Sequence, residues 1–272
     1  SQGVHIVIEK SFLNGPHAIM VPHTTDGRVL FAVPWNDFVV VGTTDTPIDI
    51  SLEEPIAMEK EIEFILENAG AYMTKKPTRK DVKSVFAGLR PLAASNNKNE
   101  STKEVSRHHK IKVSTSGLIS VLGGKWTTYR KIAEDTVNTS QLVGGLPERK
   151  CGTETLPIFG YDYNSNWNDP LHCYGTEASK INAQNPEKGS RSLSEKLYIT
   201  ENQIIWSVEQ EMAIHLEDIL ARRTRCLFLD AFETEKIAPQ VAAIMAKALQ
   251  KDQKWIEKEL ETFKTILKNY QL

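Results

Sequence analysis

The chain has 272 residues, of which 40% are hydrophobic, and its formal net charge at pH 7 is −2. This length can bury the core of one large domain or two medium ones. The near-neutral charge gives no electrostatic case for nucleic-acid binding. The three cysteines form no CxxC pair, so neither a disulfide framework nor a zinc site is predicted. No apolar stretch approaches the roughly 20 residues of a membrane-spanning helix.

The first half of the chain has the pattern of an antiparallel sheet, and the second half becomes helical. Runs of β-branched and aromatic residues separated by turn residues indicate strands, and apolar residues at a 3.6-residue period indicate helices. In chain order, we expect strands at 4–8, 18–21, 29–33 and 38–42, a helix at 54–72, strands at 82–92, 110–113 and 118–122 (the last one buried), and helices at 128–139, 218–229, 235–249 and 253–270.

The chain starts without Met, in a segment that is already strand-like, and no glycine-rich dinucleotide fingerprint precedes it. We therefore expect the C-terminal part of a larger protein, cut inside a domain. A break near Val143-Gly-Gly-Leu-Pro147 separates the sheet-rich part from the helical part. In the latter, Thr200-Glu-Asn-Gln203 has the pattern of a capping box that starts a helix.

The strongest local motif is Gly123-Gly124-Lys125-Trp-Thr127-Thr128, which follows a strand and precedes a helix. Two residues without Cβ atoms allow the backbone to approach a ligand closely. Thr127 or Thr128 is expected to cap the helix, whose first N–H groups form a positive pole for an anion or an electron-rich ring. An ordinary tight turn before a capped helix remains the alternative.

Arg90 and His5 are the charged and titratable residues that stand out on strands. Arg90 lies among apolar residues in Gly88-Leu-Arg-Pro-Leu92, which suits bidentate binding of a carboxylate or phosphate, with a structural ion pair as the alternative. His5 lies between Val4 and Ile6, where a packing role is the common one. The acidic residue of Gly42-Thr-Thr-Asp45 is expected to satisfy backbone groups of its own turn.

The C-terminal helices combine an apolar set with lysines at helical spacing. Lys247, Lys251, Lys254 and Lys258 recur on one face, which is compatible with a solvated face on a packed helix or with binding to an anionic membrane surface. No metal-binding spacing is present among the histidines.

The ordered set of motifs resembles aerobic FAD-dependent glycerol-3-phosphate dehydrogenases, members of the amino-acid-oxidase-like flavoproteins, along essentially the whole chain. The segments that carry the resemblance are Ser1-Gln-Gly-Val-His-Ile6, Phe31-Ala-Val-Pro-Trp35, Gly42-Thr-Thr-Asp45, Gly88-Leu-Arg-Pro-Leu92 and Gly123-Gly-Lys-Trp-Thr-Thr-Tyr-Arg-Lys131. It implies an α+β fold: residues 1–145 form the substrate-domain sheet and the last strand and helix of an incomplete FAD-binding domain, and residues 150–272 form a helical C-terminal domain.

The resemblance also implies an activity and its residues. The family oxidises sn-glycerol 3-phosphate to dihydroxyacetone phosphate with FAD and passes electrons to membrane quinone, at the inner face of the cytoplasmic membrane. By position, His5 and Arg90 are the expected catalytic residues, and Lys125, Arg107 and Arg90 the substrate cations. The flavin-facing residues are then Gly123, Gly124, Lys125, Thr127 and Thr128.

The fragment by itself is expected to be inactive, because the FAD diphosphate site lies upstream in the family. Two other functions stay open: a related flavoprotein oxidase of an amine or amino acid, and a non-catalytic module that docks on a partner or membrane. A cut domain should expose an apolar patch, through which a homo-oligomer could form.

Overall fold

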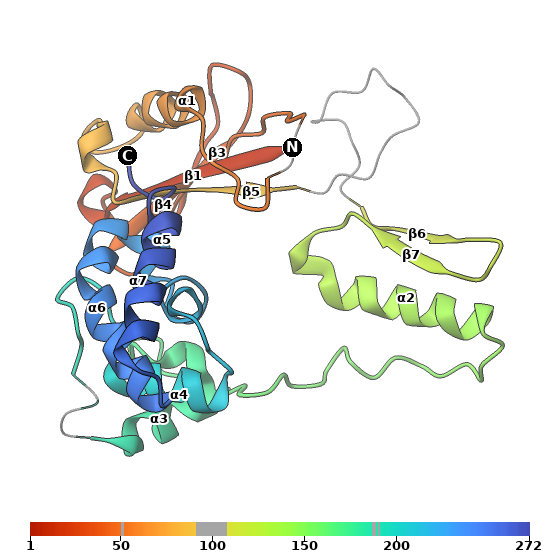
Figure 1. Cartoon of the computed structure of the whole chain (residues 1–272). Coiled ribbons are helices and arrows are strands. Elements are labelled where there is room, and N and C mark those ends of the chain that lie inside the picture. The colour runs from red at the N-terminus through yellow and green to blue at the C-terminus, as the bar shows by residue number, and fades with distance from the viewer. Residues whose placement is uncertain (50–51, 91–107, 187–188, 190) are drawn as a thin grey trace. The chain divides into compact units, whose positions relative to one another are not determined.

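The computed structural model describes all residues except 50–51, 91–107, 187–188 and 190 (Figure 1). The chain forms two compact units. The hairpin unit comprises residues 1–2, 45–51 and 89–161, and the sheet–helix unit comprises residues 3–44, 52–88 and 162–272.

A sheet with the order β2-β3-β4-β1-β5 forms the centre of the sheet–helix unit. Its strands are β1 (Gln2–Glu9), β2 (Ile19–Val21), β3 (Leu30–Trp35), β4 (Phe38–Gly42) and β5 (Ser84–Leu89). The pairs β1–β4, β2–β3 and β3–β4 are antiparallel, and β1 pairs with β4 so that His5 lies opposite Gly42. The predicted antiparallel sheet is confirmed, with β1 inserted between β4 and β5.

The alternation of side chains along β1 assigns its residues to two different cores. Val4, Ile6 and Ile8 are fully buried with residues of α1 (Glu59–Gly70), which covers one face of the sheet. Val7 instead belongs to a second core, which is shared with the C-terminal helices. His5 has the same parity as Val7, so its side chain lies on the face that the C-terminal helices cover.

The C-terminal helices pack on the sheet through backbone contacts as well as side chains. The hydroxyl of Ser84 donates to the carbonyl of Leu227 (2.8 Å), and the N–H of Val85 donates to the carbonyl of Tyr270 (2.9 Å). The helices are η4 (His172–Glu177), α3 (Ala178–Gln184), α4 (Glu201–Gln210), the π-helix η5 (Asp218–Arg223), α5 (Cys226–Leu229), α6 (Ala231–Ala248) and α7 (Gln253–Leu267).

Several predicted helices differ from the structure at their boundaries; the one expected at 54–72, for example, spans only Glu59–Gly70. The single helix expected at 218–229 is broken, because Arg225 adopts a left-handed backbone conformation (φ 62°). The helix expected to start at 235 starts at Ala231, because the carboxylate of Asp230 accepts a hydrogen bond from the N–H of Glu233 (2.9 Å) and caps it. The capping box at Thr200 and Gln203 is confirmed.

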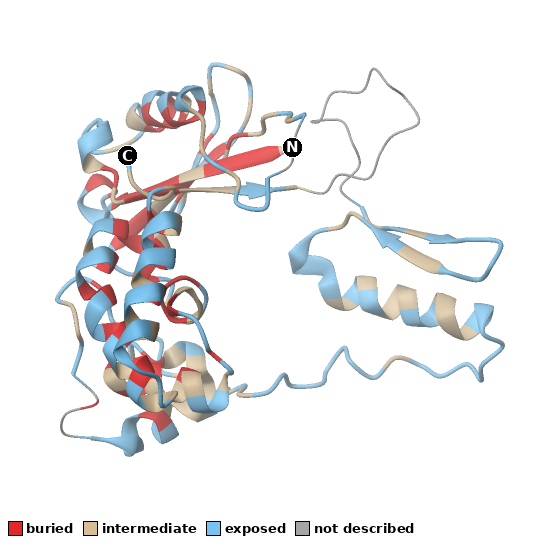
Figure 2. Ribbon diagram, in the orientation of Figure 1, coloured by how far each residue is buried: buried red, intermediate tan, exposed pale blue. Residues whose placement is uncertain are grey.

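The hairpin unit contains the antiparallel pair β6 (Lys110–Val113) and β7 (Ile119–Leu122), followed by α2 (Tyr129–Val143). None of residues 108–161 is buried (Figure 2). The strand expected at 118–122 is present as β7, but its expected burial is wrong, because Leu118 is 67% exposed and Leu122 is 41% exposed. Within the described residues, no helix is long and apolar enough to cross a membrane.

Candidate functional site

His5 is held by an aromatic row that extends to the end of the chain. Its half-buried ring stacks on Phe86 with a centroid separation of 5.2 Å and an interplanar angle of 13°. Phe228 meets Phe86 edge-on at 5.0 Å, and Tyr270 meets Phe228 edge-on at 5.5 Å. The C-terminal helices therefore take part in fixing the imidazole.

Gly42, opposite His5 on β4, leaves the space that this imidazole occupies. A Cβ atom built at Gly42 would lie 2.3 Å from Cδ2 of His5, far inside van der Waals contact. The glycine of the Gly42-Thr-Thr-Asp45 motif therefore allows the His5 side chain to lie close to the backbone of β4.

Thr44 and Asp45, the last two residues of this motif, do not form the purely local turn that we expected. Thr44 is 1% exposed, and its hydroxyl accepts from the N–H of Val4 and donates to Glu61, at 2.9 Å each. The carboxylate of Asp45, expected to satisfy its own turn, instead pairs with Arg90, with 3.2 Å between Oδ1 and Nη1. Through this ion pair, Asp45 orients the guanidinium of Arg90.

Arg90 combines a fixed position with partial access to solvent. Its backbone N–H donates to the carbonyl of Ser1 (2.8 Å), and its side chain is 25% exposed, against 8% for Asp45. The ion pair that we kept as the alternative reading is present. It is compatible with anion binding, because a guanidinium presents five donors in a planar fork.

The glycine pair forms the predicted turn between β7 and α2. Gly123 and Gly124 have φ values of 71° and 94°, and a Cβ at Gly124 would lie 2.6 Å from Cδ1 of Ile132. The expected threonine cap is wrong: no side chain caps α2, and the hydroxyl of Thr128 donates to the carbonyl of Lys125 (3.0 Å). The first turn of α2 thus keeps its positive pole without a side-chain acceptor.

The predicted site residues are divided between the two units. His5 belongs to the sheet–helix unit, whereas Arg90, Lys125, the glycine pair and Thr127 belong to the hairpin unit. Lys125, Thr127 and Thr128 are exposed. Arg107 lies outside the described residues.

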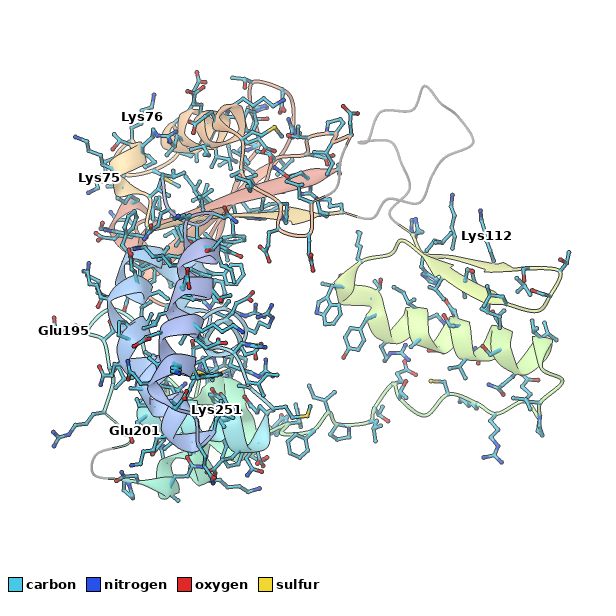
Figure 3. The ribbon with its side chains drawn as sticks, in the orientation of Figure 1. Lys75, Lys76, Lys112, Glu195, Glu201 and Lys251 are labelled. Carbon is cyan, nitrogen blue, oxygen red and sulfur yellow. The ribbon has the colours of Figure 1, made fainter. Side chains whose placement is uncertain are left out.

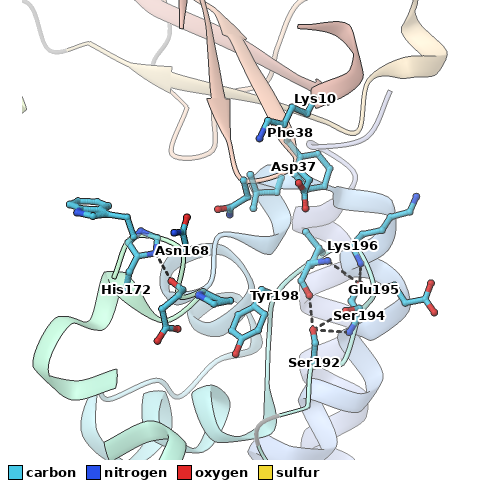
Figure 4. A pocket seen from close by; sticks show the side chains of 16 residues that line it. Lys10, Asp37, Phe38, Asn168, His172, Ser192, Ser194, Glu195, Lys196 and Tyr198 are labelled. Carbon is cyan, nitrogen blue, oxygen red and sulfur yellow. Dashed lines mark hydrogen bonds between the residues drawn. The ribbon is translucent and has the colours of Figure 1, made fainter. Parts of the chain in front are cut away.

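The sequence patterns missed a pocket of about 560 Å³ in the sheet–helix unit (Figure 4). It lies against the β3–β4 turn at Asp37 and is lined by His172 and Tyr198 of the helical region. Burial, followed by the nearby carboxylate of Asp169, raises the pKa of Tyr198. None of the predicted site residues lines this pocket. The residues that line it come from segments far apart in the sequence, so no local sequence pattern indicates it.

The chain matches two family models and several known proteins. Residues 1–130 match the FAD dependent oxidoreductase family, and residues 119–256 match the C-terminal domain of alpha-glycerophosphate oxidase. The probable mitochondrial glycerol-3-phosphate dehydrogenase of Dictyostelium discoideum is 36% identical over 98% of the chain and 46% of its own length. The human mitochondrial glycerol-3-phosphate dehydrogenase is 33% identical, over 98% of the chain and 40% of its own length.

A solved structure shares the fold. The X-ray structure of the glycerol-3-phosphate dehydrogenase from Bacillus halodurans complexed with FAD has a TM-score of 0.78 and 26% sequence identity, covering 98% of this chain and 56% of that one. The chain thus spans about half the length of the relatives that it matches. It belongs to the family defined by the C-terminal domain of alpha-glycerophosphate oxidase, whose model matches half of the chain, and its first part matches the FAD dependent oxidoreductase family.

Proposed function

We propose that the chain supplies the substrate-binding sheet and the flavin-facing turn of an FAD-dependent glycerol-3-phosphate dehydrogenase. The complete protein would oxidise sn-glycerol 3-phosphate to dihydroxyacetone phosphate. The observation that carries the proposal is the Gly123-Gly124 turn, which leads into a helix without a capping side chain. It occurs in a chain that glycerol-3-phosphate dehydrogenases match over 98% of its length.

The residues of this turn fit one edge of a flavin ring. Gly123 and Gly124 would let the backbone approach the ring, Thr127 and Thr128 would lie beside it, and the pole of α2 would stabilise negative charge on its reduced form. Bound FAD would supply the hydride acceptor. The glycine-rich fingerprint for its diphosphate does not occur in this sequence.

Oxidation of a secondary alcohol removes a hydride from carbon and a proton from the hydroxyl oxygen. We assign the acceptance of that proton to His5, since its imidazole is held in place by Phe86. Arg90, oriented by Asp45, would bind the substrate oxygens and stabilise developing alkoxide character. Lys125 and Arg107 would bind the phosphate as cationic donors.

We further propose that the electrons pass to a membrane quinone and that the protein binds peripherally to the inner face of the cytoplasmic membrane. Both proposals rest on the family resemblance. The chain by itself should be inactive and bind no FAD tightly, because its sequence contains no glycine-rich diphosphate fingerprint, which the family carries in an N-terminal FAD-binding half.

The test is an anaerobic flavin spectrum of the chain joined to that FAD-binding half. Bleaching by glycerol 3-phosphate, but not by glycine or sarcosine, supports the dehydrogenase. Bleaching by the amino compounds alone would replace it with the oxidase of amines or amino acids. A colourless protein would contradict both and favour a docking module.

The individual roles are tested in the same protein. His5→Asn should lower kcat, and Arg90→Lys should lower kcat/KM, because a point charge replaces a planar fork. Unchanged turnover in either variant would remove that residue from the proposed mechanism.

A further inference from the structure

A second site candidate is a pocket of about 280 Å³ whose wall contains four lysines. Lys80 lies in the short 3-10 helix η2 (Arg79–Asp81), and Lys83 directly precedes β5. Lys196 lies in the loop before α4, and Lys236 lies near the start of α6. All four belong to the sheet–helix unit. The pocket shares no residue with the proposed active site.

Hydrogen bonds hold the segments that bring these lysines together. The N–H of Ala231 donates to the carbonyl of Lys83 (2.9 Å), which joins the start of α6 to β5. The hydroxyl of Ser194 donates to Glu233 (2.8 Å) and accepts from the N–H of Lys196 (3.1 Å), which joins the loop to α6. These hydrogen bonds therefore fix the relative positions of the segments that carry Lys83, Lys196 and Lys236.

The carboxylates around the pocket neutralise only part of this charge. Asp230, which is 2% exposed, caps α6. Glu233 pairs with Lys236 at 3.1 Å, and Glu9 pairs with Lys83 at 2.9 Å. Lys80 and Lys196 form no ion pair within 4.0 Å among the residues that the structure describes. Counting Asp230, Glu233 and Glu9 against the four lysines leaves a formal excess of one positive charge, to which the N-terminal pole of α6 adds about half a charge.

A concave site with two exposed, unpaired ammonium groups favours a multiply charged anion. Each ammonium group offers three donors, and a phosphate group offers both the charge and the oxygen acceptors that match them. The volume also suffices, since a water takes up about 30 Å³ of liquid. Phe232, which is 40% exposed, lines the same pocket and adds an apolar contact.

We propose that the lysine pocket formed by Lys80, Lys83, Lys196 and Lys236 binds the phosphate group of an anionic molecule, at a place separate from the active site. The phosphate group could belong to a free small molecule or to a lipid headgroup, and the two sources are separable by experiment. The site needs neither flavin nor turnover, so its test is independent of the proposed function.

The test uses the chain as it is, titrated with inorganic phosphate by calorimetry and mixed with vesicles of phosphatidylglycerol or of phosphatidylcholine in a flotation assay. The variant Lys80→Gln/Lys196→Gln removes the two unpaired charges. The control Lys110→Gln/Lys112→Gln removes the same charge from β6 of the hairpin unit, where Lys112 lies (Figure 3). All four side chains are exposed, so we expect both variants to fold.

We expect the pocket variant to weaken binding of phosphate, of phosphatidylglycerol vesicles or of both by about tenfold or more. The control should change it less than about twofold, as a general charge effect would. If the pocket variant loses binding of inorganic phosphate, the ligand is a free phosphate compound. If it loses only the binding of phosphatidylglycerol vesicles, the ligand is a lipid headgroup. Equal loss in both variants, or binding to neither probe by the unaltered chain, would overturn the proposal.

A further control removes Lys125, one of the cations of the proposed active site. Binding that persists in Lys125→Gln but is lost in the pocket variant assigns it to the lysine pocket. The reverse result would assign the phosphate to the active site and would also overturn the proposal.

Discussion

Among single residues, Gly42 illustrates how a sequence motif can encode space for a neighbouring side chain. The imidazole of His5 lies where a Cβ of residue 42 would be, at 2.3 Å. The imidazole also stacks on Phe86, with 5.2 Å between the ring centroids, which leaves it little room to move away.

Gly42→Ala should therefore displace His5 and destabilise the chain by about 1–3 kcal/mol through overpacking. Urea unfolding of the isolated chain measures this effect. Gly88→Ala is the matched control, because no atom lies within 4 Å of its Cβ position, and its unfolding free energy should change by less than about 1 kcal/mol. Equal effects of the two substitutions would contradict the packing argument.

The cysteines should differ in reactivity, because the thiolate is the nucleophile. Burial raises the pKa of the Cys226 thiol to about 12, whereas a hydrogen bond with the hydroxyl of Thr153 lowers the pKa of Cys151. At pH 8, iodoacetamide should modify Cys151 first and leave Cys226 intact, as peptide mass spectrometry would show. In urea the difference should disappear, and modification of Cys226 in the folded chain would contradict the assignment.

Between elements, a buried polar network joins α1 to the sheet. The hydroxyl of Thr44 connects the N–H of Val4 to Glu61, whose other oxygen accepts from the N–H of Met58 (3.0 Å) at the start of α1. Thr44 and Glu61 are 1% and 2% exposed. Loss of one member of such a network costs more than loss of an exposed hydrogen bond.

Thr44→Val should consequently lower the free energy of unfolding by about 1–3 kcal/mol, since it removes both bonds at constant shape. Thermal or urea unfolding measures the change. In Thr265→Val, which removes an exposed hydroxyl bonded to the carbonyl of Glu261, the change should stay within about 0.5 kcal/mol. An unchanged free energy of unfolding in Thr44→Val would contradict a stabilising role for this network.

For the molecule as a whole, the hairpin unit presents apolar side chains, and its residues 108–161 include no buried core. Among them, Val137 is 56% exposed, Leu142 84% and Leu146 61%, and a pocket of about 530 Å³ between α2 and residues 146–153 adds to this surface. Uncovered apolar surface of this kind favours association.

We predict that the chain self-associates at tens of micromolar and that Leu142→Asp/Leu146→Asp reduces this association. Sedimentation velocity measures it directly. Met212→Asp, at an 84% exposed apolar position of the sheet–helix unit, should have little effect. A monomeric chain that binds no hydrophobic dye would exclude an open apolar face.

Local sequence patterns predicted those elements whose formation depends on residues close together in the sequence. The strands around His5, the capping box at Thr200 and the turn at Gly123-Gly124 follow from side-chain alternation, capping chemistry and glycine. The boundary of α6 was missed because its start depends on one carboxylate, that of Asp230.

The sequence by itself determined the class of the fold, the order of its elements and the family, because periodicity and ordered motifs are properties of the chain. Tertiary structure alone decided the pairing of Asp45 with Arg90, the aromatic row behind His5 and the convergence of four lysines on one pocket. These contacts join residues far apart in the sequence, for example Ser194 with Glu233. Their partners are selected by how sheet and helices pack, which no local pattern records.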